Sequence, residues 1–311
     1  MIEVEDIRKS YRGAPALDGF NLRVADGELF GLVGPNGAGK TTLIRILATL
    51  LRPDGGRARV AGIDVAAHPE RVKGMMGYMP DQPGLYQDMR VFEFLEFFAE
   101  AFRLPKQQRR AAVDRELKRS DLIGRRHDYV EELSFGMKQR LFLAKTLLHE
   151  PKLLLLDEPA TGLDPMARIA LRQQLKELNA QRITILISSH ILADLEDICS
   201  RVALIAGGMN ADDGAGQSVV ELRQAGLSTQ TYDVEVLGDA AAAAKCAVEI
   251  AGVRILEVQP ARMVLEIAGE ARDASHLLAH LVRLGIEVVR FDRRVATLED
   301  RYRHAFGGKA R

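Results

Sequence analysis

The stretch of sequence that decides the fold is Gly34-Pro35-Asn36-Gly37-Ala38-Gly39-Lys40-Thr41. It fits the pattern G-x-x-x-x-G-K-[ST], and it stands between a predicted strand, residues 28–33, and a predicted helix, residues 40–50. In that context the glycines let successive backbone N–H groups turn inward and hold phosphate at the start of the helix. Lys40 is then expected to reach the β- and γ-phosphates of a nucleotide, and the Thr41 hydroxyl is expected to bind Mg²⁺.

Two carboxylates follow a second apolar stretch further along the chain. Residues 153–156 are four leucines, the pattern of a parallel strand that is buried on both faces. Asp157 and Glu158 come directly after this strand. Downstream of a phosphate-binding loop, this arrangement predicts that Asp157 holds Mg²⁺ and that Glu158 polarises the attacking water as a general base.

The remaining pattern of the first 225 residues is that of an α/β domain. From residue 165 to residue 206, predicted helices and strands alternate, which is typical of a sheet connected by crossover helices. Residues from about 90 to 145 interrupt the alternation with helices rich in Phe, Leu and paired charges, and they are predicted to form a helical insert. The loop, the insert and the alternation together predict a P-loop NTPase domain over residues 1–225.

A second, smaller domain is predicted after this one. Residues 207–216 are rich in glycine and aspartate and break the alternation. The region 230–311 then has strands and helices in the order β-α-β-β-α-β, which predicts an α+β domain of the ferredoxin-like kind. We expect an accessory or regulatory role for it.

Further motifs lie between and after these elements, and they point to a family. Residues 133–140, Leu-Ser-Phe-Gly-Met-Lys-Gln-Arg, resemble the LSGGQ signature of ABC ATPase subunits. Residues 161–164, Thr-Gly-Leu-Asp, are similar to the D-loop of that family, and residues 188–190, Ser-Ser-His, to its switch-histidine segment. The resemblance covers about the first 225 residues and implies the ABC ATPase fold.

The resemblance also implies how the site works, with ATP and Mg²⁺ bound. Glu158 and His190 would be the catalytic residues, with His190 hydrogen-bonded to the γ-phosphate, and Tyr11 would stack on adenine. Ser134 and Gly136 would face the γ-phosphate held by a second copy, so a homodimer, or a heterodimer with a similar subunit, is implied. The expected ATP-binding residues are Tyr11, Gly34, Pro35, Asn36, Gly37, Ala38, Gly39, Lys40, Thr41, Thr42, Ser134, Gly136 and Asp164.

Two departures from the family pattern affect these expectations. Phe135 stands where the family usually has glycine, and Met137 where it often has glutamine, so a side chain at 135 could restrict the approach of the signature helix to phosphate. The glutamine expected after residues 78–80 is replaced by Asp81, with Gln82 one residue later. Either Asp81 takes the Mg²⁺-facing role as a carboxylate, or a shift in register presents Gln82.

The charge balance and the hydropathy of the chain exclude some classes of function. The chain has 43 basic and 43 acidic residues, and this neutral balance argues against a nucleic-acid partner. No apolar run approaches the roughly 20 residues that a transmembrane helix needs. With the resemblance to bacterial exporter-type ABC ATPases, this implies a cytoplasmic subunit, held at the inner face of the membrane, that powers a separate integral-membrane permease, with export favoured over import.

Two alternatives stay open. One is a soluble ABC-type ATPase acting on ribosomes or nucleic acid, but such relatives usually have two cassettes, a long coiled coil or zinc-binding cysteines, and none of these is visible. The other is a nucleotide-dependent regulator with weak hydrolysis, which the changes at residues 81 and 135 keep open.

Overall fold

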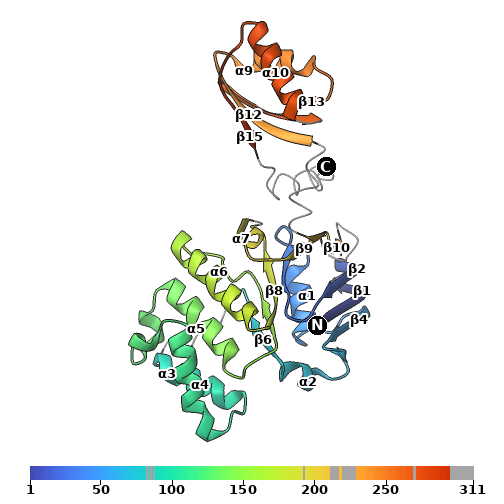
Figure 1. Cartoon of the computed structure of the whole chain (residues 1–311). Helices are drawn as coiled ribbons and strands as arrows, with labels where there is room; N and C mark the ends of the chain where they lie inside the picture. Colours follow the sequence, from blue (N-terminus) through green and yellow to red (C-terminus); the bar gives the residue numbers. More distant parts are fainter. Residues whose placement is uncertain are drawn as a thin grey trace. The chain divides into compact units, whose positions relative to one another are not determined.

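In the computed structural model the glycine-rich loop follows an inner strand of a mainly parallel sheet (Figure 1). Residues 29–33 and 153–156 are buried throughout. Their burial explains why these strands are continuous apolar runs rather than alternating ones. In spatial order, and among the described residues, the strands are β10 (Met209–Asn210), β9 (Arg201–Ala206), β3 (Leu29–Val33), β8 (Thr184–Ser189), β7 (Leu153–Leu156) and β6 (Met76–Met79), and β11 (Gln217–Ser218) also pairs with β9.

A smaller antiparallel sheet shares an apolar core with the parallel sheet. Helix α1 (Lys40–Leu47) lies between the two sheets (Figure 1), and its Leu43 and Ile44 are fully buried. Phe20 of the smaller sheet and Phe30 of the parallel sheet belong to the same buried cluster. The core therefore fixes the start of α1, and with it the glycine-rich loop. In spatial order, the described strands of the smaller sheet are β2 (Ala14–Val24), β1 (Ile2–Tyr11), β4 (Gly55–Val60) and β5 (Ile63–Asp64).

The predicted helical insert is present beside the parallel sheet (Figure 1). Capping side chains mark where two of the helices begin. The Ser134 hydroxyl accepts a hydrogen bond from the Met137 backbone N–H at 3.3 Å, and an Asp164 carboxylate oxygen accepts one from the Ala167 N–H at 2.9 Å. The other described helices of this unit are α2 (Pro69–Lys73), α3 (Val91–Ala101), α4 (Lys106–Arg119), α5 (Phe135–Leu147), α6 (Pro165–Ala180) and α7 (Ala193–Glu196), with 3₁₀ turns at Ile123–Arg125 and Val130–Glu132.

The C-terminal unit has the predicted β-α-β-β-α-β order of elements. Its two helices cover one face of an antiparallel sheet and bury Val234, Leu265 and Leu277 in a core of their own (Figure 1). The elements are β12 (Thr229–Leu237), α9 (Ala240–Val248), β13 (Val253–Gln259), β14 (Arg262–Ala268), α10 (Ala271–Arg283) and β15 (Glu287–Arg294), and the strands lie in the spatial order β13-β14-β12-β15.

The chain divides into two units, Met1–Val219 and Val220–Arg311. The predicted boundary at residues 225–230 falls mostly outside the described residues. None of the helices in the described part has the length and apolarity to span a membrane. The structure describes residues 1–81, 84, 86, 88–191, 193–210, 217–218, 229–268 and 271–294.

Candidate nucleotide site

A cavity of about 320 Å³ opens beside the glycine-rich loop. Tyr11, at the end of β1, and Asp81, just after β6, lie on its wall together with Glu158 from the end of β7. The ends of β3, β6 and β7 lie close together because the carboxyl ends of parallel strands meet at one edge of a sheet, whereas Tyr11 comes from the smaller antiparallel sheet. The cavity thus collects most of the residues predicted to bind nucleotide, and its lining is Tyr11, Ala16, Asn36, Gly37, Ala38, Gly39, Lys40, Thr41, Thr42, Asp81 and Glu158.

Two glycines of the loop are required by close backbone contacts. Gly39 has φ of 109°, and a Cβ at this position would lie 2.4 Å from the carbonyl oxygen of Ala16. A Cβ at Gly34 would lie 2.3 Å from the carbonyl oxygen of Ile205. Only glycine avoids both the strained φ and these contacts, so the loop sequence follows from its packing between β2 and β9.

The Lys40 ammonium is buried and directed into the loop. It donates to the carbonyl oxygens of Gly34 at 2.6 Å and Pro35 at 3.1 Å, and it lies 3.1 Å from Oε1 of Glu158. The contact with Glu158 is an ion pair without hydrogen-bond geometry, because Oε1 has no hydrogen-bond partner among the described residues. The geometry holds the charge at the base of the loop, where a phosphate oxygen would replace one of the present partners.

Glu158 joins the two sides of the site. Its Oε1 faces Lys40, and its Oε2 lies 2.7 Å from Nδ1 of His190 and accepts the His190 backbone N–H at 3.3 Å. The Thr161 hydroxyl donates to the same oxygen at 3.3 Å. Glu158 has φ of 50°, a left-handed conformation that a non-glycine residue adopts only when its surroundings impose it. This carboxylate is therefore tightly positioned.

Asp157 is fully buried, and only one of its two carboxylate oxygens accepts a hydrogen bond. The Ser188 hydroxyl donates to its Oδ1 at 2.7 Å and accepts the Glu158 backbone N–H at 3.0 Å. Its Oδ2 has no hydrogen-bond partner among the described residues. Burial raises the pKa of the Asp157 carboxyl, the hydrogen bond from Ser188 and the nearby Thr41 hydroxyl oppose that rise, and the nearby charges of Glu158 and Asp81 add to it.

These groups fit a divalent cation next to phosphate. A cation at Oδ2 would compensate the buried charge of Asp157, and Thr41 already contacts that carboxylate. No cluster of three or more His, Cys, Asp or Glu suited to a metal occurs within the described residues. Mg²⁺ here would consequently take further oxygen ligands from phosphate and water, as it usually does in nucleotide sites.

Sequence reasoning missed the role of Ser188. It lies at the carboxyl end of the buried strand β8, next to β7, and its hydroxyl links the backbone of Glu158 to the side chain of Asp157. The available signal was a polar residue ending a buried strand. Of the two candidates after β6, Asp81 lies on the cavity wall, whereas Gln82 falls outside the described residues.

The other predicted residues do not line the cavity. Ser134 and Asp164 cap α5 and α6, and Gly136 lies in the first turn of α5 against Ala167 and Leu163. The structure therefore places the phosphate loop and the signature segment at different sites of one chain.

Sequence comparison finds relatives over most of the chain. The family model described as ABC transporter matches residues 17–161. The chain is 38% identical over 219 residues to the Nod factor export ATP-binding protein I of Paraburkholderia xenovorans strain LB400, covering 70% of this chain and 72% of that protein. It is 37% identical to the daunorubicin resistance ATP-binding protein DrrA3 of Streptomyces coeruleorubidus over 72% of this chain and 74% of that protein.

One relative extends through the C-terminal unit. The uncharacterized ABC transporter ATP-binding protein YxlF of Bacillus subtilis strain 168 is 32% identical over 302 residues, covering 97% of this chain and 98% of that protein. Among solved structures, an ATP-binding subunit of an ABC transporter matches with a TM-score of 0.64 at 31% identity, covering 72% of this chain and 92% of that one. The fold is also that of the ATP-binding cassette MJ0796 in a dimeric structure bound to ADP and Pi, with a TM-score of 0.64 at 23% identity, over 70% of this chain and 99% of that one.

Proposed function

This chain belongs to the ABC transporter family, as an ATP-binding subunit that hydrolyses ATP to power a separate membrane permease, and we propose that the permease moves its cargo outward. Export is supported by two relatives whose names refer to Nod factor export and daunorubicin resistance. The observation that carries the ATPase function is the meeting of Lys40, Thr41 and Glu158 in one cavity beside the glycine-rich loop.

In this proposal different residues at the site bind phosphate, hold Mg²⁺ and accept the proton. Lys40 gives up its contact with Glu158 and donates to phosphate oxygens, and Thr41 and Asp157 would hold Mg²⁺. When bound, Mg²⁺ would offset the charge of the phosphates. Glu158, freed from Lys40, accepts a proton from the water that attacks the γ-phosphorus, and ADP leaves. His190 orients the carboxylate through the 2.7 Å contact.

The proposed site is completed by a second copy of the chain, or by a similar subunit. Ser134 and Gly136 stand at the start of α5, where free backbone N–H groups and the helix dipole favour an anion. They do not line the cavity of their own chain. A γ-phosphate held by one loop would thus meet the signature helix of the other subunit, and ATP would hold the two copies together.

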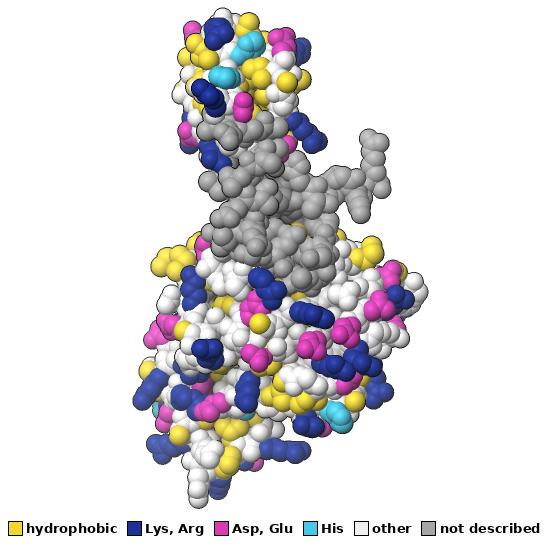
Figure 2. Space-filling view, turned by 45° about the vertical axis from the view of Figure 1, so that its right-hand side comes forward, with side chains coloured by type: hydrophobic (Ala, Val, Ile, Leu, Met, Phe, Trp, Pro, Cys, Tyr) yellow, Lys and Arg dark blue, Asp and Glu magenta, His cyan; other side chains and the backbone are white. Residues whose placement is uncertain are grey.

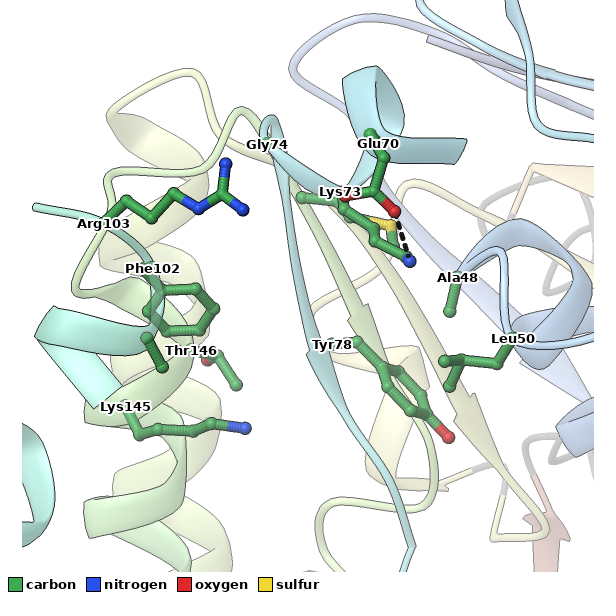
Figure 3. Close-up of a pocket in the computed structure, with 12 residues that line it drawn as sticks. Ala48, Leu50, Glu70, Lys73, Gly74, Tyr78, Phe102, Arg103, Lys145 and Thr146 are labelled. Atoms are coloured by element: carbon green, nitrogen blue, oxygen red, sulfur yellow. Dashed lines mark hydrogen bonds and ion pairs between the residues drawn. The ribbon is translucent and has the colours of Figure 1, made fainter. Parts of the chain in front are cut away.

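A groove between the helical insert and the α/β core is the proposed docking place for the permease (Figure 3). One wall carries Leu50 and Tyr78, and the other carries Phe102 and Lys145, whose side chain points into the groove (Figure 3). Its lining holds three basic side chains, Lys73, Arg103 and Lys145, against one acidic side chain, Glu70. A cytoplasmic segment of the permease with apolar side chains and a carboxylate matches this surface.

The short strand β6 supplies a physical connection from groove to cavity. Tyr78 lines the groove, and Asp81, three residues later, lines the nucleotide cavity. Burial raises the pKa of the Tyr78 phenol, and the charges of Asp157 and Asp81 also raise it, so the phenol lies within electrostatic reach of the site. A segment of the permease that packs against Tyr78 would therefore contact the strand that ends at Met79, two residues before Asp81.

The permease proposal is tested by affinity purification of the tagged chain from solubilised native membranes. We expect a multi-span membrane protein in stoichiometric amount. Lys145→Glu should lower its recovery, and the exposed Lys176→Glu on α6 is the matched control. Recovery with ribosomes or nucleic acid instead would favour the alternative function. Basic and acidic side chains are interspersed over the visible face of the first unit, as Figure 2 shows, and this pattern gives that alternative no support.

Lys145 also gives a prediction for stability against pH. Its ammonium lies over the rings of Phe98 at 4.6 Å and Phe142 at 4.7 Å, and it makes no ion pair with any described residue. Burial lowers the pKa of Lys145 from 10.5 to about 8. Between these pH values the unfolded chain binds the proton and the folded chain does not, so the free energy of unfolding should rise with pH.

The expected rise between pH 8 and 10.5 is at most about 3.5 kcal/mol, because one pKa unit corresponds to about 1.4 kcal/mol. Urea unfolding of the wild type and of Lys145→Met across this range measures it as the difference between the two proteins. Parallel pH profiles would show that burial does not disfavour the charged lysine.

A further inference from the structure

The ring of Phe135 packs on the loop that follows Glu158. Phe135 is the first residue of α5 and is 54% exposed, so its packing is not that of a core residue. A Cβ at Gly162 would lie 3.1 Å from Cε1 and 3.2 Å from Cζ of the Phe135 ring. The far edge of the ring therefore lies close over Gly162, and a side chain there would require the ring to move by a few tenths of an ångström.

The next residue of the helix also lies close to this segment. A Cβ at Gly136 would lie 3.4 Å from Cβ of Ala167 and 3.8 Å from Cδ2 of Leu163, which is ordinary van der Waals distance. The start of α5 therefore leaves little space between itself and either the loop or the first turn of α6. Because these segments are closely packed, a shift of α5 is expected to move the loop with it.

Thr161, the residue before Gly162, connects this loop to the carboxylate of Glu158. The hydroxyl of the neighbouring residue, Thr161, donates to Oε2 of Glu158 at 3.3 Å, and its backbone N–H donates to the Glu158 carbonyl oxygen at 3.1 Å. Gly162 itself has φ of 78°, which sets the turn between Thr161 and α6. Phe135, Gly162, Thr161 and Glu158 form one continuous set of contacts.

We propose that Phe135 is a positioning residue that couples the signature segment to Glu158 of the same chain. When α5 meets the phosphate bound by the second copy, the ring presses on Gly162, and Thr161 aligns Glu158 for its own ATP. Each site then senses whether the other is filled. The inference rests on the proposed pairing of two copies. The glycine usual at this position in the family has no ring to make such a contact.

The test is a double-mutant cycle between residues 135 and 162, read in the ATPase reaction of the whole chain. Phe135→Ala is expected to lower kcat about 10-fold with little change in the ATP concentration for half-maximal rate, and to bring the Hill coefficient toward 1. Phe135→Leu, which keeps apolar bulk against Gly162, should retain most of the rate. Gly162→Ala should also lose activity, because its Cβ meets the ring and because an L side chain is strained at a φ of 78°.

The double variant decides whether the two residues act through their contact. Removing the ring makes room for the Cβ, so Phe135→Ala combined with Gly162→Ala should be clearly less impaired than the product of the single effects predicts. Phe97→Ala, a similarly exposed phenylalanine of α3, is the matched control and should leave kcat and the Hill coefficient unchanged. The melting temperature of every variant shows whether a lost rate comes from unfolding or from a displaced Glu158 carboxylate.

Failure of this inference is distinguishable from failure of the pairing. ATP-driven dimerisation of the Glu158→Gln protein should persist when Phe135→Ala is added. Wild-type kcat and cooperativity in Phe135→Ala, or strictly multiplicative single effects in the double variant, would overturn the coupling role while the dimer stands. If Phe135→Ala and Phe135→Leu lose kcat equally and both melt at a lower temperature, the ring only stabilises the fold. That result would also overturn the coupling role of Phe135.

Discussion

Replacing Glu158 by glutamine is expected to lower kcat for ATP hydrolysis by about 10²–10⁴ while leaving ATP binding intact. The amide keeps the shape of the side chain but cannot accept the proton from the attacking water. It also removes the charge that lies 3.1 Å from the Lys40 ammonium. Lys40 is then free to donate to phosphate oxygens, so ATP should bind at least as tightly as in the wild type.

The same variant should accumulate as an ATP-bound dimer, because hydrolysis no longer separates the two copies. Phosphate release measures the rate, and light scattering at saturating ATP with Mg²⁺ measures the mass. Glu177→Gln, an exposed change on α6, is the matched control and should behave as the wild type. Hydrolysis at the wild-type rate in Glu158→Gln would remove this residue from the reaction.

Asp157→Asn is expected to lower the rate of ATP hydrolysis without lowering the stability of the fold. Its carboxylate is fully buried, and Oδ2 has no hydrogen-bond partner among the described residues. An uncompensated buried charged group costs at least about 1–3 kcal/mol, so the neutral amide should make the protein equally stable or more stable in Mg²⁺-free buffer. Without the carboxylate to hold Mg²⁺, hydrolysis should fall by about 10²-fold or more.

Thermal melting in EDTA and the Mg²⁺ dependence of the ATPase rate measure the two effects. Asp239→Asn, in the C-terminal unit, is the control, because asparagine caps a helix as well as aspartate does. An Asp157→Asn protein that melts well below the wild type in EDTA, or that keeps Mg²⁺-dependent hydrolysis, would contradict the assignment of this carboxylate to the cation.

The parts of the fold that could be read from the sequence are those with strong local signals. The glycine-rich loop has a fixed spacing, and the four leucines before Asp157 are typical of a buried strand when they follow such a loop. Strand β2 has no such signal. Its alternation is broken where Gly19 adopts a positive φ and where the pairing with β1 shifts register more than once, so periodicity alone does not reveal it.

The site was predictable as a set of residues but not as a geometry. Sequence motifs give Lys40, Asp157, Glu158 and His190, whereas the bridge made by Ser188 depends on β7 and β8 lying side by side. The Lys40–Glu158 contact joins residues that are far apart in the chain, and it follows only from strand order. The sequence also shows that residue 135 has a side chain that could restrict the approach of the signature helix to phosphate. That the Phe135 ring points toward Gly162 depends on the packing between α5 and the loop, which the sequence does not reveal.

The central claim is that each working site combines the phosphate loop of one copy with the signature helix of another. Mixing two separately inactive chains tests it most directly. Lys40→Ala disables the loop, and Ser134→Arg blocks the signature segment, so neither protein alone should hydrolyse ATP. A mixed dimer has one site with both defects and one site with neither. At equal amounts, half of the dimers are mixed and each has one intact site, so about a quarter of the wild-type rate is the upper limit of what should return. The coupling proposed for Phe135 lowers the returned rate further, because the other site of the mixed dimer holds no phosphate against the signature segment. A mixture that stays inactive, although two affinity tags prove that mixed dimers form, would contradict the claim.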